Sequence, residues 1–128
     1  MRDLASNIGV AATLVPATQA ATLKGTAVYL RDYDSAALVI NTGAIVGAGL
    51  YVMSLQESDT TTDGDFTDVA ADDMVGSLPA SLAASSTYKV SYVGNKRYLR
   101  AVITKTSGTS IDAGAVVVLG RAHRSPIA

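Results

Sequence analysis

The chain has 128 residues, of which 48% are apolar and only 5% aromatic, and its formal net charge is −1. This length suits one domain with a hydrophobic core, whereas the near-zero charge argues against a nucleic-acid-binding protein. The absence of cysteine excludes disulfides and thiolate metal sites. No run of about 18 apolar residues is present, so no membrane span is expected. The polar residues that follow Leu4 argue against a signal peptide.

The N-terminal segment, residues 1–24, mixes alanine, threonine and short apolar runs around Pro16. The proline argues against a long helix, so we expect an extended N-terminal arm. Ile8, Val10, Leu14 and Val15 are too apolar to remain in water. The arm is therefore expected to pack either on the domain or on a neighbouring molecule.

Short strands are predicted over residues 26–30 and 36–42. The second has apolar side chains on both faces, namely Leu38, Ile40, Ala37 and Val39. This pattern predicts a central strand covered on both sides. The connection that follows, residues 43–49, contains Ile45 and Val46, which are unusual in a loop. It is either a contact surface or a loop folded back under the sheet.

Residues 50–58 alternate between apolar and mixed side chains, which predicts a strand. A loop rich in threonine and aspartate follows, and Phe66 and Val69 are expected to pack the returning chain onto the core. Residues 70–86 are read as a loop with one helical turn. Residues 111–119 are predicted to form the last strand, and residues 121–128 a C-terminal tail.

Residues 88–104 are predicted to form two strands joined by a two-residue turn at Gly94-Asn95, since both residues tolerate positive φ. One face of this hairpin holds Tyr88, Val90, Tyr92, Leu99, Ala101 and Ile103. The other face would place Lys89 opposite Arg100, and like charges in that position are mildly destabilising. This basic face is either simply solvated or has an acidic partner.

The spacing of short strands and turns, without an amphipathic helix, is typical of an all-β fold. We expect a single antiparallel β-sandwich or jelly-roll-like barrel over residues 25–120, preceded by the arm and followed by the tail.

No chemical motif is complete. A calcium loop starting at Asp59 would place Gly64 correctly at position 6, but Ala70 falls where the bidentate glutamate is needed. The glycines at 47 and 49 begin a nucleotide-binding pattern whose third glycine is missing. These features predict neither a metal nor a cofactor.

Catalytic groups are similarly sparse. His123, the only histidine, lies in the tail, so a serine–histidine–aspartate arrangement is not expected. A hydrolytic carboxylate pair could be drawn only from Glu57, Asp59 and Asp68, which are more simply read as hydrated. The sequence therefore indicates a structural or binding protein, not an enzyme.

Four stretches carry a resemblance to a known group: MRDLASNI at 1–8, LQESDTTTDGDFTDV at 55–69, GNKRYLRAVIT at 94–104 and AGAVVVLGRAHRSP at 113–126. They resemble small proteins encoded among the head genes of tailed bacteriophages, near the major capsid protein. Such proteins are often head decoration (cement) proteins, or else head-completion or tail components. The resemblance implies a virion protein, and we expect it to be made in the bacterial host cytoplasm and, if it is a cement protein, to lie on the head exterior.

A cement protein binds the outside of the assembled shell, bridges capsomers and stabilises the head against the pressure of packaged DNA. The expected partners are the major capsid protein and sister copies in a dimer or trimer, without nucleic acid or membrane. The candidate contact residues are Ile8, Val10, Leu14, Ile45, Val46, Lys89, Tyr98, Arg100, Arg121 and Arg124.

Two alternatives remain open. One is a head–tail connector or tail protein, which would form a ring of defined number. The other is a carbohydrate-binding module on the virion surface, for which Tyr29, Tyr51 and Tyr98 are the available aromatic platforms.

Overall fold

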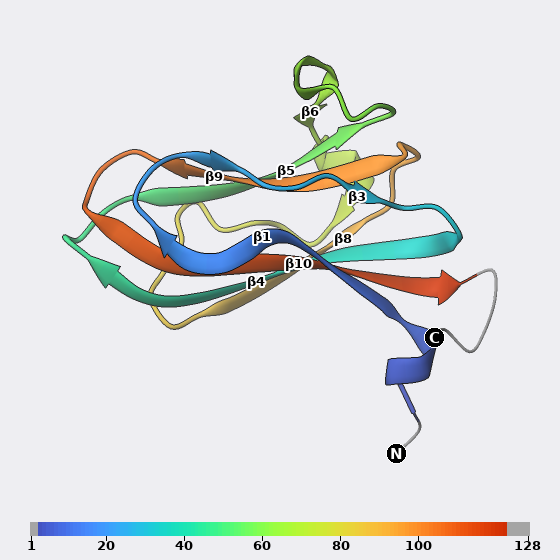
Figure 1. Cartoon of the computed structure of the whole chain (residues 1–128), viewed down its shortest axis with the longest axis horizontal. Helices are drawn as coiled ribbons and strands as arrows, with labels where there is room; N and C mark the ends of the chain where they lie inside the picture. Colours follow the sequence, from blue (N-terminus) through green and yellow to red (C-terminus); the bar gives the residue numbers. More distant parts are fainter. Residues whose placement is uncertain (1–2, 123–128) are drawn as a thin grey trace.

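The computed structural model describes residues 3–122 and consists of two antiparallel β-sheets packed face to face (Figure 1). Sheet A has the strand order β1-β10-β4-β8-β7. Its strands are β1 (Gly9–Gln19), β4 (Tyr33–Val46), β7 (Met74–Val75), β8 (Thr87–Tyr92) and β10 (Ser110–Ala122). Sheet B has the order β2-β9-β5-β6, and β3 also pairs with β9. Its strands are β2 (Leu23–Lys24), β3 (Val28–Tyr29), β5 (Tyr51–Ser58), β6 (Thr67–Asp68) and β9 (Tyr98–Lys105).

The expected all-β sandwich is thus confirmed. Short 3-10 helices interrupt the connections at η1 (Ala5–Asn7), η2 (Asp63–Asp65) and η3 (Ala71–Asp73). No helix within residues 3–122 is long and apolar enough to cross a bilayer.

The core lies between the two sheets and follows from the two-residue period of the strands. In β5, Tyr51, Met53 and Leu55 are buried while their neighbours point outward, as the sequence predicted. Val69 is also buried in this core and holds the returning chain there, which confirms that prediction, whereas Phe66 is buried outside the core cluster, against Arg100 on the outer side of sheet B. A single cluster of aliphatic side chains from both sheets therefore stabilises the fold.

The predicted N-terminal arm is instead largely part of the sandwich. β1 pairs with β10 from Gly9 opposite Leu119 to Gln19 opposite Ile111, and β2 joins sheet B. Pairing with β10 buries Leu14 and half-buries Ile8, whereas Val10 and Val15 stay 60% and 66% exposed. Pro16 is tolerated because β1 is an edge strand whose register shifts on either side of Leu14.

The predicted hairpin at Gly94-Asn95 is wrong. β8 pairs with β4 in sheet A, whereas β9 pairs with β5 in sheet B, so residues 93–97 cross from one sheet to the other. Lys89 therefore lies opposite Val39, and Arg100 lies opposite Gln56. The predicted inward face is nevertheless correct, because both strands turn the same alternate residues toward the shared core.

The two longest strands extend beyond their predicted limits. β4 continues through most of the predicted 43–49 connection, which leaves a tight turn in which Gly47 and Ala48 have positive φ. β10 extends into the predicted tail as far as Ala122. The rest of that tail, residues 123–128 with His123 and Arg124, lies outside the described residues.

Candidate functional site

The outer face of sheet A is apolar. Since β10 turns its odd-numbered residues into the core, its even-numbered residues point outward, and the strand pairing aligns them with apolar residues of β1 and β4. Val118 lies between Val10 and Ala37, and Val116 lies between Ala12 and Val39. These six residues, Val10, Ala12, Ala37, Val39, Val116 and Val118, are called the valine face.

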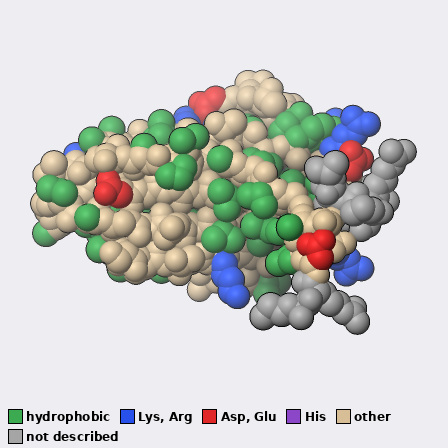
Figure 2. Space-filling view, turned by 60° about the horizontal axis from the view of Figure 1, so that its bottom comes forward, with side chains coloured by type: hydrophobic (Ala, Val, Ile, Leu, Met, Phe, Trp, Pro, Cys, Tyr) green, Lys and Arg blue, Asp and Glu red, His purple; other side chains and the backbone are tan. Residues whose placement is uncertain are grey.

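The valine face is open to solvent. Val10 is 60% exposed, and the valines of β4 and β10 on this face are only half-buried. Figure 2, turned to bring this side of the molecule forward, shows hydrophobic side chains gathered at its centre with few charged groups among them. The prediction that β4 is central is confirmed, but the prediction that both its faces are covered is wrong. No second layer from residues 3–122 packs on its outer side.

A shallow hollow of about 680 Å³ adjoins the valine face, between β1 and β4. Its floor is Gly114, where an added Cβ would lie only 2.7 Å from Cγ of Pro16. At one end Thr18 donates a hydrogen bond of 2.7 Å to Asp112. Glycine is therefore required here for the bulged edge strand to pass close to β10.

The outer face of sheet B, in contrast, is covered around Arg100 by the chain itself. Arg100 points outward from β9, yet it is only 7% exposed because its guanidinium lies 4.0 Å from the centre of the Phe66 ring. It donates a hydrogen bond of 2.9 Å to Gln56 and forms an ion pair of 2.7 Å with Asp63. Arg100 therefore fastens the loop between β5 and β6 onto sheet B.

This β5–β6 loop contains the aspartates and Gly64 of the incomplete calcium-loop pattern. The carboxylate of Asp63 accepts hydrogen bonds from Lys24, at 2.9 and 3.1 Å, as well as contacting Arg100. These two cations, Lys24 first, lower the pKa of the Asp63 carboxyl below its ordinary value. Within residues 3–122, no group of three metal-ligating side chains is assembled. The acidic loop thus engages basic side chains of its own chain.

A polar contact joins the two sheets at one end of the core. The Tyr92 hydroxyl of β8 donates a hydrogen bond of 2.7 Å to the buried Glu57 carboxylate of β5 and accepts one from the Lys96 backbone N–H. Burial, and next the bond to Glu57, raise the pKa of Tyr92 well above its ordinary value. At the other end, the buried hydroxyl of Tyr51 has no hydrogen-bond partner among the described residues.

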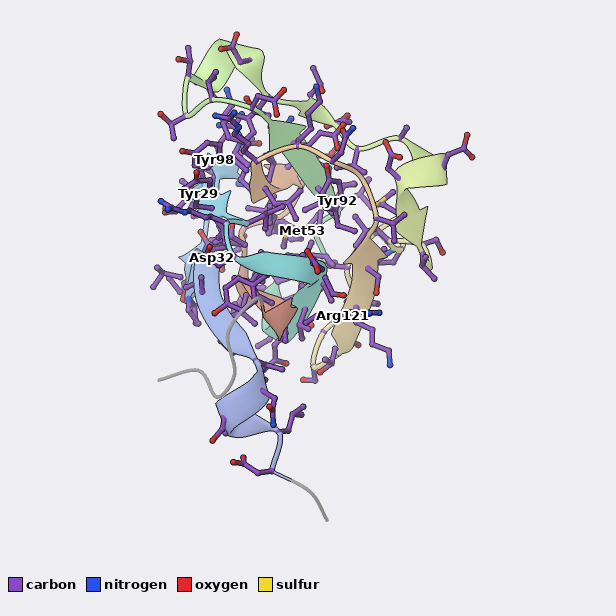
Figure 3. All side chains as sticks on the ribbon, turned by 90° about the vertical axis from the view of Figure 1, so that its right-hand side faces the viewer. Tyr29, Asp32, Met53, Tyr92, Tyr98 and Arg121 are labelled. Carbon is purple, nitrogen blue, oxygen red and sulfur yellow. The ribbon has the colours of Figure 1, made fainter. Side chains whose placement is uncertain are left out.

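Beside Tyr92, a cleft of about 530 Å³ opens between the β3–β4 and β8–β9 connections. Tyr29 and Tyr98 stack at its margin, with ring centres 4.9 Å apart and planes inclined by 18°. Figure 3, which faces this end of the sandwich, shows these two rings together on one side and Tyr92 on the other. Three basic residues, Arg31, Lys96 and Arg97, and one acidic residue, Asp34, also line the cleft.

The ten candidate contact residues are scattered over the molecule. Exposed among them are Val10, Val46, Lys89 and Arg121. Half-buried are Ile8, Ile45 and Tyr98. Leu14 and Arg100 are buried within this chain, so their side chains are not available to a partner and these two predictions are wrong. Arg124 lies outside the described residues.

The other side chains considered from the sequence are also placed. Glu57, Asp59 and Asp68 contact Tyr92, Lys96 and Gln56, respectively, so each has a partner of its own. Of the three proposed aromatic platforms, Tyr29 and Tyr98 are brought together, whereas Tyr51 is fully buried in the core.

The sequence analysis missed five residues of the valine face, namely Ala12, Ala37, Val39, Val116 and Val118. The signal was present, because residues 36–40 and 115–119 are apolar at both odd and even positions. Such runs are usual for strands covered on both faces. The same pattern also describes a strand with one buried face and one bare apolar face.

Comparisons with known proteins bear on the fold. No family model and no curated protein matches the sequence. Among solved structures, the SPBc2 prophage-derived protein YomS has a TM-score of 0.52 at 8% identity, over 88% of this chain and 93% of that one. Weaker matches are PirA (TM-score 0.43, 12% identity, 90% and 94% covered) and infectious bursal disease virus strain Gx (0.39, 13%, 93% and 34%). At these identities, this chain shares the fold of YomS, and the two weaker matches carry no inference.

Proposed function

We propose that this protein is a decoration protein of a tailed-phage head, and that it binds the outer surface of the assembled capsid shell through the valine face. The observation that carries the proposal is the open apolar face of sheet A, since exposed apolar patches of this kind mark protein–protein contacts. The resemblance to phage head-gene proteins supports a capsid as the partner. The shared fold with a prophage-derived protein is compatible with this assignment.

Decoration requires no catalysis. A copy bound across neighbouring capsomers adds a weak contact to each, and many copies together stabilise the assembled shell over its separate subunits. A flat apolar face can pack onto a folded capsid surface without any ordering of the chain. The valine face thus replaces the Lys89/Arg100 face, which the structure does not form, as the proposed contact surface.

The test uses heads that lack this protein, to which purified protein is added back. Val118→Asp places a charge on the valine face, and we expect it to weaken head binding by about tenfold or more. Val52→Asp is the matched control, because Val52 also points outward and half-buried, but from sheet B. It should bind like the unmodified protein.

Two results would contradict the proposal. One is equal heat resistance of heads with and without the protein, and the other is normal head binding by Val118→Asp. Copy number in purified particles addresses the connector alternative. Decoration predicts a number that scales with the shell, whereas a connector predicts a single ring.

A further inference from the structure

We infer that the cleft between the β3–β4 and β8–β9 connections binds a carboxylated sugar. This site is at the end of the sandwich, so it is separate from the valine face and independent of the proposed attachment to a capsid. Its volume of about 530 Å³ is within the range of ligand pockets. The inference depends on three features of the cleft: a free aromatic face, a cation without an ion pair among the described residues, and two fixed loops.

The aromatic face belongs to Tyr29. One side of its ring stacks on Tyr98, yet the residue remains 47% exposed, which leaves the other side open to a ligand. The face of an aromatic ring is negative, so it attracts the weakly positive C–H groups on the flat side of a sugar ring. Because Tyr98 holds the ring in place, little side-chain entropy is lost when a ligand binds.

Three cations outnumber Asp34, the one acidic residue of the lining, so the cleft favours a negatively charged ligand. Arg31 and Lys96 each lie near a carboxylate, at 3.8 Å from Asp32 and 3.3 Å from Asp59. Arg97 is exposed and makes no ion pair with any residue in the range 3–122. An arginine fork of this kind can hold a carboxylate through two parallel hydrogen bonds.

The loops that carry these groups are held in fixed positions. The Leu30 N–H donates a hydrogen bond of 2.9 Å to the Arg97 carbonyl, which links the two connections. Gly94 packs against the Tyr92 ring so closely that an added Cβ would collide with the phenol. The hydroxyl of Ser35 and the amide of Asn95 also line the cleft and suit the hydroxyl groups of a sugar. The cleft is therefore largely preformed for a polar, anionic, ring-shaped ligand.

A nucleic-acid strand is the less favoured ligand. Its backbone requires a positively charged groove along several phosphates, whereas this cleft offers three cations, two of which already lie near aspartates. A single carboxylate needs only one free arginine.

The experiment titrates the purified protein with two probes, tetragalacturonate and sialyllactose, while amide NMR shifts are recorded. At least one probe should shift the amides of the cleft at concentrations up to ~10 mM, and the methyl ester of tetragalacturonate should bind about tenfold more weakly because its charge is lost. Arg97→Gln should weaken binding of the acidic probe by a similar factor. Lys89→Gln, on the outer side of sheet A, should leave it unchanged.

Tyr29→Ala should weaken both the acidic probe and its ester, because it removes the ring face and not the charge. Arg97→Gln, at an exposed side chain that forms no ion pair within residues 3–122, is the variant that keeps the fold if Tyr29→Ala does not. The inference is wrong if neither probe shifts the cleft amides. It is also wrong if inorganic phosphate or a short oligonucleotide binds there as tightly as the sugars. Head attachment is measured separately, so either proposal can fail alone.

Discussion

The two outer faces of the sandwich differ in how much the chain itself covers them. On sheet B, the loop between β5 and β6 folds back, and Arg100 and Val102 are buried although they point away from the core. On sheet A, the corresponding outward residues of β10 and β4 remain open and apolar. The difference shows that an outward side chain is buried or exposed according to whether another segment of the chain covers it. Substitutions at the covered outward residues of sheet B should therefore affect folding, and substitutions at the uncovered outward residues of sheet A should affect binding.

The largest effect on folding is expected for Arg100→Ala. It removes the contact with Phe66, the hydrogen bond to Gln56 and the ion pair with Asp63. We expect the free energy of unfolding, measured by urea denaturation, to fall by about 2–4 kcal/mol. Lys89→Ala removes an exposed cation from sheet A and should change it by less than about 0.5 kcal/mol. Equal effects of the two substitutions would remove the distinction between the faces.

The next largest effect on folding is expected from substituting one glycine of sheet A, compared with one glycine of the loop over sheet B. At Gly114 a new Cβ would meet the Pro16 ring at 2.7 Å, so Gly114→Ala overpacks β1 against β10. The expected cost is about 1–3 kcal/mol in the free energy of unfolding. Gly64, in the loop over sheet B, has no atom within 4 Å of its added Cβ. Gly64→Ala should be neutral or stabilising by up to about 1 kcal/mol, and a larger loss there would contradict this account of the two glycines.

A third test addresses two tyrosines that lie between the sheets, away from both outer faces. Tyr92→Phe leaves the buried Glu57 carboxylate without its hydroxyl donor and should cost about 1–2 kcal/mol. Tyr51→Phe removes a buried hydroxyl that has no partner among the described residues, so it should be neutral or stabilising. Thermal unfolding of the two variants side by side measures the difference.

The same pair predicts a pH dependence. The pKa of Tyr92 is raised by folding, so its contribution to stability is complete below pH 10 and is lost as the pH rises above that value. Above pH 10 the unmodified protein should lose up to about 1.4 kcal/mol of stability per pH unit from this one group. Tyr92→Phe should flatten the alkaline slope. An unchanged slope would show that Tyr92 titrates alike in both states.

The sequence predicted which residues face the core better than it predicted which strands pair. Alternation in β5, β8 and β9 identified the buried side chains correctly, because the period of two depends only on the presence of a core on one side. The same alternation fits both a hairpin within one sheet and an arch between two sheets. Gly94 and Asn95 favour a tight turn locally, but the pairing of β8 with β4 and of β9 with β5 depends on contacts far away in sequence.

The candidate surfaces were less accessible from the sequence. Burial of Leu14 and Arg100 depends on β10 and on the β5–β6 loop, which local patterns do not place next to them. The stacking of Tyr29 on Tyr98 was likewise hidden, because β3 and β9 are about 70 positions apart in the chain and meet only in sheet B. The valine face was indicated by two apolar runs, but the sequence does not say whether a second layer covers it.

The smallest effect on folding is expected at the valine face itself, and it provides the closest comparison between the two sides. Val118 and Val102 both point outward from long strands, but Val102 is only 6% exposed and Val118 is half-buried. Threonine keeps the shape of valine and adds a hydroxyl, which costs free energy only where water cannot reach it. Val118→Thr should therefore change the free energy of unfolding by less than about 0.5 kcal/mol, and Val102→Thr should lower it by about 1 kcal/mol or more. The proposed attachment predicts that Val118→Thr will nevertheless weaken head binding. Folded Val102→Thr protein should bind heads normally, because only the uncovered surface is available to a partner.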